Sequence, residues 1–206
     1  MQISRRFIKR ISFSIGMLIL LAPFTALAQT KVVVIPLEAE HTGPLAPVSK
    51  TGQTLSMGER DDGALQKGVQ WPSPRFIDNG NGTVTDKLTG LIWLKNANRF
   101  GPRSWPEALS DCNGLAAGSS GLMDDSKAGD WRLPNIRELL SLVDYGKTGP
   151  CLPEGHPFDG VNSNAYWSST YREFDSWVVS FVSPSVFYVI YSSDARYYVW
   201  PVRGGQ

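Results

Sequence analysis

The sequence predicts a small α+β fold. Three observations carry this prediction: a hairpin pattern followed by a third strand, two short amphipathic helical patterns, and several β-branched and aromatic runs near the carboxyl end. The 206 residues suit one domain preceded by an export segment and an arm. All seven tryptophans lie at or beyond Trp71, so core-forming side chains are concentrated in the last two thirds of the chain. We therefore expect the folded domain to occupy residues 71–206.

Residues 1–28 have the pattern of a secretory signal peptide. Four basic residues precede an apolar run at residues 11–21, and Ala26-Leu27-Ala28 supplies a small-x-small cleavage site. A retained membrane anchor is the alternative, but the apolar run is shorter than the roughly 20 residues that a spanning helix needs. We expect an exported protein, whether periplasmic, secreted or on the outer surface, with no membrane span after cleavage.

Export has two consequences for the mature chain. Cleavage after Ala28 leaves 16 of the 20 basic residues against 19 acidic ones, so the formal net charge changes from +1 to −3. A nucleic-acid partner then lacks an electrostatic basis. Cys112 and Cys151 enter a compartment in which disulfides persist. The sequence leaves open whether these two cysteines form a disulfide or remain free thiols.

Residues 29–70 are interpreted as an extended arm or linker. They contain scattered prolines and a single apolar run, KVVVIPL. A proline directly after such a run favours an edge strand or a linker over a central strand. Residues 59–66, ERDDGALQ, are interpreted as a solvated turn.

The domain opens with a predicted hairpin and a third strand. Residues 75–78 and 83–86 alternate around the turn NGNG, whose residue types accept positive φ easily. The third strand is LIWLK, residues 91–95. Calcium is the one cofactor that this region suggests, because the loop carries four oxygen-bearing side chains: Asp78, Asn79, Asn81 and Asp86. The ligand spacing of an EF-hand is missing, so we favour the turn and expect no cofactor.

Two short amphipathic helices are expected next. The first lies in SWPEALSDCNGL, with Ser104 as N-cap and Gly114 as its stop. The second lies in DWRLPNIRELLSLVDYG, where Pro134 begins the helix and Gly146 ends it. Its buried stripe is expected to contain Ile136, Leu139, Leu140 and Val143.

The carboxyl end is expected to form strands with an exposed aromatic surface. The strand-like runs are YWSST, SWVVSFV, VFYVIYSS and RYYVWPVRG, and residues 176–193 carry no charge. A strand from Val186 to Tyr191 has apolar or aromatic residues on both faces, and a small domain can bury only one face of an outer sheet. Tyr, Trp and Arg also dominate binding hot spots. The predicted ligand-binding residues are Tyr171, Arg172, Phe174, Asp175, Trp177, Phe187, Tyr188, Tyr191, Asp194 and Arg196. Trp93, Trp131 and Trp167 are assigned to the core.

Five motifs in series resemble the Lcl C-terminal domain family, named for the end of a bacterial collagen-like adhesin. They are RFIDNGNGTVTDKLTGLIWLKNA, WPEALSDCNGL, DWRLPNIRELLSLVD, YWSST and YYVWPVRGG. The resemblance implies a C-type lectin-like fold with two short helices packed on small antiparallel sheets and long irregular loops. It also implies a surface role, since the namesake's domain binds sulfated polysaccharides. Many relatives carry a cysteine where this chain has Pro201, so the family's disulfide pattern does not transfer.

We expect a non-catalytic module that binds a glycan or a surface protein. The sequence has no nucleophile elbow, no HExxH motif and no phosphate loop. One alternative is a lectin-fold oxidase of the formylglycine-generating type, and another is a structural envelope component held through the arm. Residues 171–198 contain neither Asn nor Lys, which resembles segments that an adenine-mutating retroelement diversifies, so a variable receptor is a further hypothesis.

Overall fold

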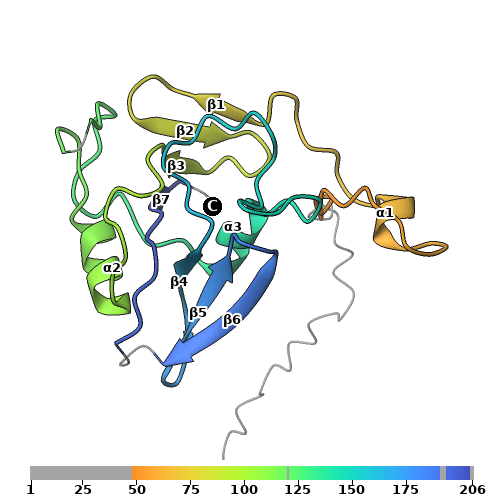
Figure 1. Cartoon of the computed structure of the whole chain (residues 1–206). Coiled ribbons are helices and arrows are strands. Elements are labelled where there is room, and N and C mark those ends of the chain that lie inside the picture. Colours follow the sequence, from red (N-terminus) through yellow and green to blue (C-terminus); the bar gives the residue numbers. More distant parts are fainter. Residues whose placement is uncertain (1–47, 120, 191–193, 205–206) are drawn as a thin grey trace, which may run out of the picture. The chain divides into compact units, whose positions relative to one another are not determined.

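The computed structural model describes residues 48–119, 121–190 and 194–204, which form short helices and two small antiparallel sheets (Figure 1). The predicted α+β class is confirmed. The predicted signal peptide and the first part of the predicted arm, up to residue 47, lie outside the described residues. None of the helices in the described ranges has the length and apolar character needed to cross a membrane.

The first sheet has the strand order β1-β2-β3-β7. Its strands are β1 (Phe76–Asp78), β2 (Thr83–Asp86), β3 (Ile92–Leu94) and β7 (Val202–Arg203). The predicted hairpin and third strand are confirmed, and β1 and β2 pair antiparallel with Asp78 opposite Val84. Gly80 and Gly82 in the turn have φ values of 72° and 86°, where a side chain would be strained.

The second sheet has the order β4-β5-β6. Its strands are β4 (Ala165–Arg172), β5 (Asp175–Ser180) and β6 (Ser185–Ile190). The prediction of a strand throughout RYYVWPVRG is wrong, because only its last part forms β7. Pro201 has no N–H to donate, and Tyr197 and Tyr198 make only isolated bridges. This segment instead runs between the sheets and pairs briefly with several neighbours.

The helix α2 (Trp105–Asn113) begins and ends as the sequence predicts. The Ser104 N–H donates to Glu107 Oε2 at 2.8 Å, which is one half of a capping box. The helix α3 (Ile136–Ser141) is shorter than predicted, with Asn135 as its N-cap. The chain leaves the helix before Gly146 because the Asp144 N–H donates to the Cys151 carbonyl at 2.9 Å instead of an intrahelical partner.

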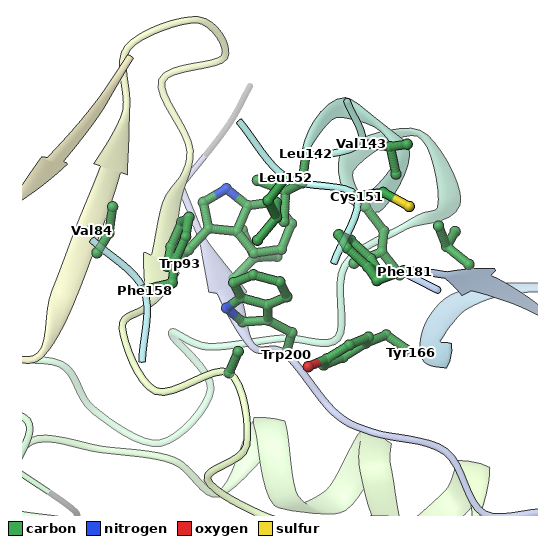
Figure 2. Close-up of a cluster of buried hydrophobic side chains, with 14 of the residues drawn as sticks. Val84, Trp93, Leu142, Val143, Cys151, Leu152, Phe158, Tyr166, Phe181 and Trp200 are labelled. Atoms are coloured by element: carbon green, nitrogen blue, oxygen red, sulfur yellow. The ribbon is translucent and has the colours of Figure 1, made fainter. Parts of the chain in front are cut away.

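Trp200 lies at the centre of the largest core cluster (Figure 2). Its ring contacts Trp93 at 5.8 Å and Phe158 at 4.9 Å between ring centroids. On the other side it contacts Tyr166 at 5.4 Å and Phe181 at 5.8 Å. These edge-to-face and tilted contacts join the first sheet to the second.

The three tryptophans assigned to the core are fully or almost fully buried. Trp93 and Trp131 are 0% exposed and Trp167 is 1% exposed, so this prediction is confirmed. They belong to three different clusters, so each one packs in a separate part of the interior.

The described part of the predicted arm, residues 48–70, contains the four-residue helix α1 (Asp62–Leu65). The interpretation of residues 59–66 as a turn is therefore wrong at α1. The helix forms because the Asp61 side chain accepts the Ala64 N–H at 2.8 Å. The two ends of this segment meet, since the Val69 N–H donates to the Val48 carbonyl at 2.8 Å. The Tyr145 N–H donates to the Thr51 carbonyl at 2.9 Å, which attaches the segment to the region after α3.

A buried ion pair holds the start of the first sheet. The Arg75 side chain is 4% exposed and the Asp86 side chain is 0% exposed. Arg75 donates from Nε and Nη2 to the two Asp86 oxygens at 3.0 and 2.8 Å. Asp86 also accepts the Leu88 N–H at 3.0 Å, so it closes the turn between β2 and β3.

We expect Asp86→Ala to lower the free energy of unfolding by about 3 to 5 kcal/mol, because it leaves the Arg75 guanidinium buried without its partner. Asp78→Ala is the control, since Asp78 pairs with Lys95 in a half-exposed position and its loss is expected to cost about 1 kcal/mol or less. Urea denaturation measures both values. Equal effects of the two substitutions would contradict a structural role for the buried pair.

Candidate functional site

The register of the second sheet decides which predicted ligand-binding residues share a face. Trp177 lies opposite Tyr188, and Asp175 lies opposite Ile190. Arg172 lies opposite Asp175 in the neighbouring hairpin. Directly opposite residues of an antiparallel pair point to the same face. These five side chains therefore share one face of the sheet.

The other face of the sheet is covered. Trp167 and Val178 are buried there, and Phe187 and Val189 pack against the same cluster. The ring of Phe187 lies 5.8 Å from that of Tyr197 between centroids. Phe187 was predicted to contact a ligand, but its side chain faces the interior and is partly buried. Phe187 therefore packs on the covered face of the sheet and is not part of the exposed face.

The shared face carries a partly exposed surface of aromatic, aliphatic and charged side chains, which we call the sheet surface and define as Arg172, Asp175, Trp177, Tyr188 and Ile190. Tyr188 is 59% exposed and Ile190 is 54% exposed. The Trp177 and Tyr188 rings form a T-shaped pair with centroids 5.7 Å apart. Arg172 and Asp175 form a long ion pair of 3.9 Å at one end. The surface thus combines aromatic rings with one weakly held charge pair.

The sheet surface is exposed because α3 covers only part of this face. Under α3, Val179 is buried and Val186 packs against the cluster that includes Leu139. A six-residue helix is about 9 Å long, whereas a six-residue strand extends about 20 Å. The part of β5 and β6 that contains Trp177 and Tyr188 therefore lies beyond the helix.

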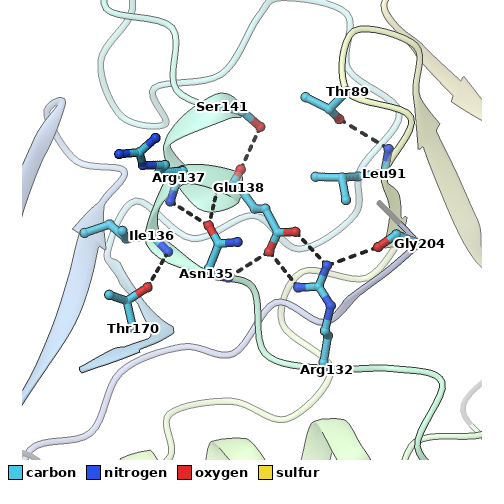
Figure 3. A network of polar contacts seen from close by, with 10 residues as sticks. All are labelled: Thr89, Leu91, Arg132, Asn135, Ile136, Arg137, Glu138, Ser141, Thr170 and Gly204. Atoms are coloured by element: carbon cyan, nitrogen blue, oxygen red, sulfur yellow. Dashed lines mark hydrogen bonds and ion pairs between the residues drawn. The ribbon is translucent and has the colours of Figure 1, made fainter. Parts of the chain in front are cut away.

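A polar network fixes the position of α3 (Figure 3). Arg132 donates two hydrogen bonds of 2.6 Å to the Glu138 carboxylate and one of 3.1 Å to the Gly204 carbonyl. The Ile136 N–H donates to Thr170 Oγ1 in β4 at 3.0 Å. These bonds tie the first turn of α3 to both the carboxyl end and the second sheet. They therefore determine how far along the sheet the helix reaches.

The remaining predicted ligand-binding residues lie elsewhere or outside the described residues. Phe174 is 69% exposed in the turn between β4 and β5, at the rim of the sheet surface. Tyr171 is 63% exposed but belongs to the opposite face, where its ring lies 5.9 Å from that of Trp105. Arg196 pairs with Glu107 of α2 at 2.9 Å, and Asp194 is exposed nearby in sequence. Tyr191 lies outside the described residues.

Ile190 belongs to the sheet surface but was not among the predicted residues. The signal that identifies it is the two-residue period of a strand, which places Ile190 on the face of Tyr188. Its aliphatic side chain is not of the aromatic or arginine types that dominate binding hot spots.

A family model described as the Lcl C-terminal domain matches residues 82–203. The chain belongs to the Lcl C-terminal domain family. No curated protein matches the chain. The matched range includes α2, α3, the whole second sheet and the entire sheet surface. Membership of this family is consistent with an adhesin-like C-terminal domain.

Both cysteines of this Lcl C-terminal domain are buried free thiols in the structure. Cys112 belongs to the cluster of Trp167, whereas Cys151 belongs to the cluster of Trp200. Burial raises the pKa of both thiols. A raised thiol pKa leaves little nucleophilic thiolate at neutral pH.

The hairpin oxygens considered for calcium are used in local contacts. Asp78 accepts the Gly80 N–H at 3.0 Å, and its other oxygen pairs with Lys95 at 2.9 Å. Asn79 and Asn81 hydrogen-bond within the turn, and Asp86 is bound to Arg75. In the described ranges of the chain, no group of three or more His, Cys, Asp or Glu side chains is arranged to hold a metal ion.

We expect Tyr188→Ala to lower the free energy of unfolding by about 1 kcal/mol or less, because the side chain is mostly exposed and loses mainly its ring contact with Trp177. Tyr166→Ala is the matched control, since Tyr166 is 0% exposed and its loss is expected to cost about 3 to 5 kcal/mol. Thermal and urea unfolding compare the two variants. A large loss of stability in Tyr188→Ala would show that the sheet surface serves the fold.

Proposed function

We propose that this protein is an exported, adhesin-like binding module that recognises a glycan or a cell-surface protein through the sheet surface. The observation that carries the proposal is the exposed Tyr188 and Ile190 beside the half-buried ring of Trp177, which pairs with Tyr188. A cluster of exposed apolar side chains on one face is a common feature of interaction sites. Aromatic side chains bury a large area on binding at a low cost in conformational entropy.

The charges around the site favour an uncharged or weakly charged ligand over a strongly sulfated polymer. Four arginines, Arg99, Arg103, Arg172 and Arg196, are the candidates for binding sulfate. Three of them are paired with an acid: Arg103 with Asp111, Arg172 with Asp175 and Arg196 with Glu107. Arg99 is exposed and has no ion pair among the residues that the structure describes. A polyanion would have to displace these partners. The net charge of −3 expected for the mature chain adds repulsion.

We infer that the module recognises its ligand without turnover. The two buried thiols, with their raised pKa values, give no support to an oxidase that depends on reactive cysteines. The C-type lectin-like fold implied by the sequence motifs belongs to this proposal, and the two small sheets with short helices agree with it. Export to the periplasm or the cell surface belongs to it as well, since the amino-terminal sequence has a signal-peptide pattern.

The test is binding of the purified chain to an array of glycans and surface proteins. We expect Trp177→Ala and Tyr188→Ala each to weaken binding of the best ligand at least about tenfold, as the truncation of a hot-spot aromatic residue does. Tyr145→Ala is the matched control, because Tyr145 is 43% exposed and lies outside the sheet surface. Wild-type affinity in both sheet-surface variants would refute the proposed site.

A further inference from the structure

A pocket separate from the sheet surface lies where the segment that precedes the family domain meets the region after α3. The pocket encloses about 190 Å³. Residues 50–54 and Trp71 form much of its wall, and Asp144 comes from the family domain. A cavity needs about 10 to 15 Å³ of such volume to hold one water, so the pocket has room for a group much larger than one water.

Asp144 is a buried carboxylate with one oxygen unpartnered. The residue is 6% exposed. Its Oδ1 accepts the Gly146 N–H at 2.8 Å, whereas Oδ2 has no hydrogen-bond partner within the described parts of the chain. Oδ2 is not one of the fully buried side-chain atoms that lack a partner, so it keeps access to solvent. Oδ2 is therefore the polar atom of Asp144 that is available to a ligand in the pocket.

Gly52 allows the preceding segment to approach this carboxylate. Its φ is 89°, and a Cβ atom built there would lie 2.2 Å from Asp144 Oδ1 and 2.8 Å from the Trp71 ring. Only glycine permits this approach. The Trp71 indole N–H is used to hold the wall, because it donates to the Lys50 carbonyl at 3.0 Å. The Arg75 guanidinium lies over one face of the Trp71 ring, 5.0 Å from the centroid, and the ring also lines the pocket.

The surrounding groups distinguish a neutral ligand from a cation. Lys147 and Arg75 already act electrostatically on Asp144, and Lys50 lines the same pocket. A cationic ligand would be repelled by these positive charges. The other wall side chains include Gln53, Gln66, Gln70 and Thr54, which supply uncharged donors and acceptors. An aromatic face, a carboxylate acceptor and several amides suit a ring with hydroxyl groups.

We propose that this pocket binds a single uncharged, hydroxyl-bearing ring of monosaccharide size, with a ligand hydroxyl donating to Asp144 Oδ2 and the ring lying against Trp71. The proposal does not rest on the sheet surface. All of the lining residues except Asp144 precede the range matched by the family model, so most of the pocket wall comes from the segment before that range.

The experiment titrates the full chain with glucose, galactose, mannose and N-acetylglucosamine, with binding followed by ligand-observed NMR. We expect at least one of these sugars to bind with a dissociation constant on the order of 1 mM. Asp144→Asn preserves the acceptor for Gly146 but places an NH2 donor at the Oδ2 position, so it should weaken binding at least about tenfold. Asp125→Asn, an exposed carboxylate outside the pocket, should bind as the wild type does.

Two further variants distinguish loss of the pocket from loss of folding and from the sheet-surface site. Gln70→Ala changes an exposed wall residue and tests the pocket if Asp144→Asn unfolds the protein; it should also weaken sugar binding. Tyr188→Ala should leave sugar binding in the pocket unchanged, so failure of this proposal and failure of the sheet-surface proposal are distinguishable. The pocket proposal is overturned if no sugar binds at about 50 mM, if neither wall variant weakens binding, or if methylammonium binds in preference to the sugars.

Discussion

The packing of Trp200 is the contact on which the arrangement of the two sheets depends. Its ring touches Trp93 of the first sheet and Tyr166 of the second, and its indole N–H donates to the Leu94 carbonyl at 2.9 Å. Each small sheet has an apolar face that must be buried against another element. A single aromatic residue between them supplies both the shared apolar area and a satisfied polar group.

This packing determines which surface is left for binding. The segment with Trp200 runs between the sheets, and α3 is tied in place by Arg132 and Glu138 beside it. Because α3 has only six residues, it covers Val179 and Val186 but stops short of Trp177 and Tyr188. The aromatic surface is thus a consequence of a short helix on a longer sheet. The network around Arg132 consequently influences the candidate site without being part of it.

The segment before the matched range packs against the family domain and forms most of a pocket there. Residues 48–71 return on themselves, attach to Tyr145 and place Gly52 against Asp144. The carboxylate is held by Gly146 on one side and open on the other. Two candidate binding features therefore arise from different parts of the chain, one within the domain of the family and one at its junction with the preceding segment.

The local elements were largely determined by the sequence alone. The NGNG hairpin, the capping residues Ser104 and Glu107, and the two-residue period of the carboxyl-terminal strands are short-range signals, and they predicted most elements and the buried tryptophans. The early end of α3 could not be predicted from helix signals, because the Asp144 N–H bonds to the Cys151 carbonyl in the irregular segment that follows. The break in the last strand could not be predicted either, because the Tyr197 and Tyr198 backbones bond to Arg103 and Ala165, which are distant in sequence.

Only the tertiary structure decided which faces are covered. Phe187 and Tyr188 are adjacent and similar, and both were candidates for a binding surface. The register of β5 and β6 and the position of α3 place Phe187 against the interior and Tyr188 toward solvent. The same holds for Gly52 and Asp144, which meet across 92 positions of sequence. Alternation along a strand is a property of the local chain, whereas burial depends on what the rest of the chain packs against it.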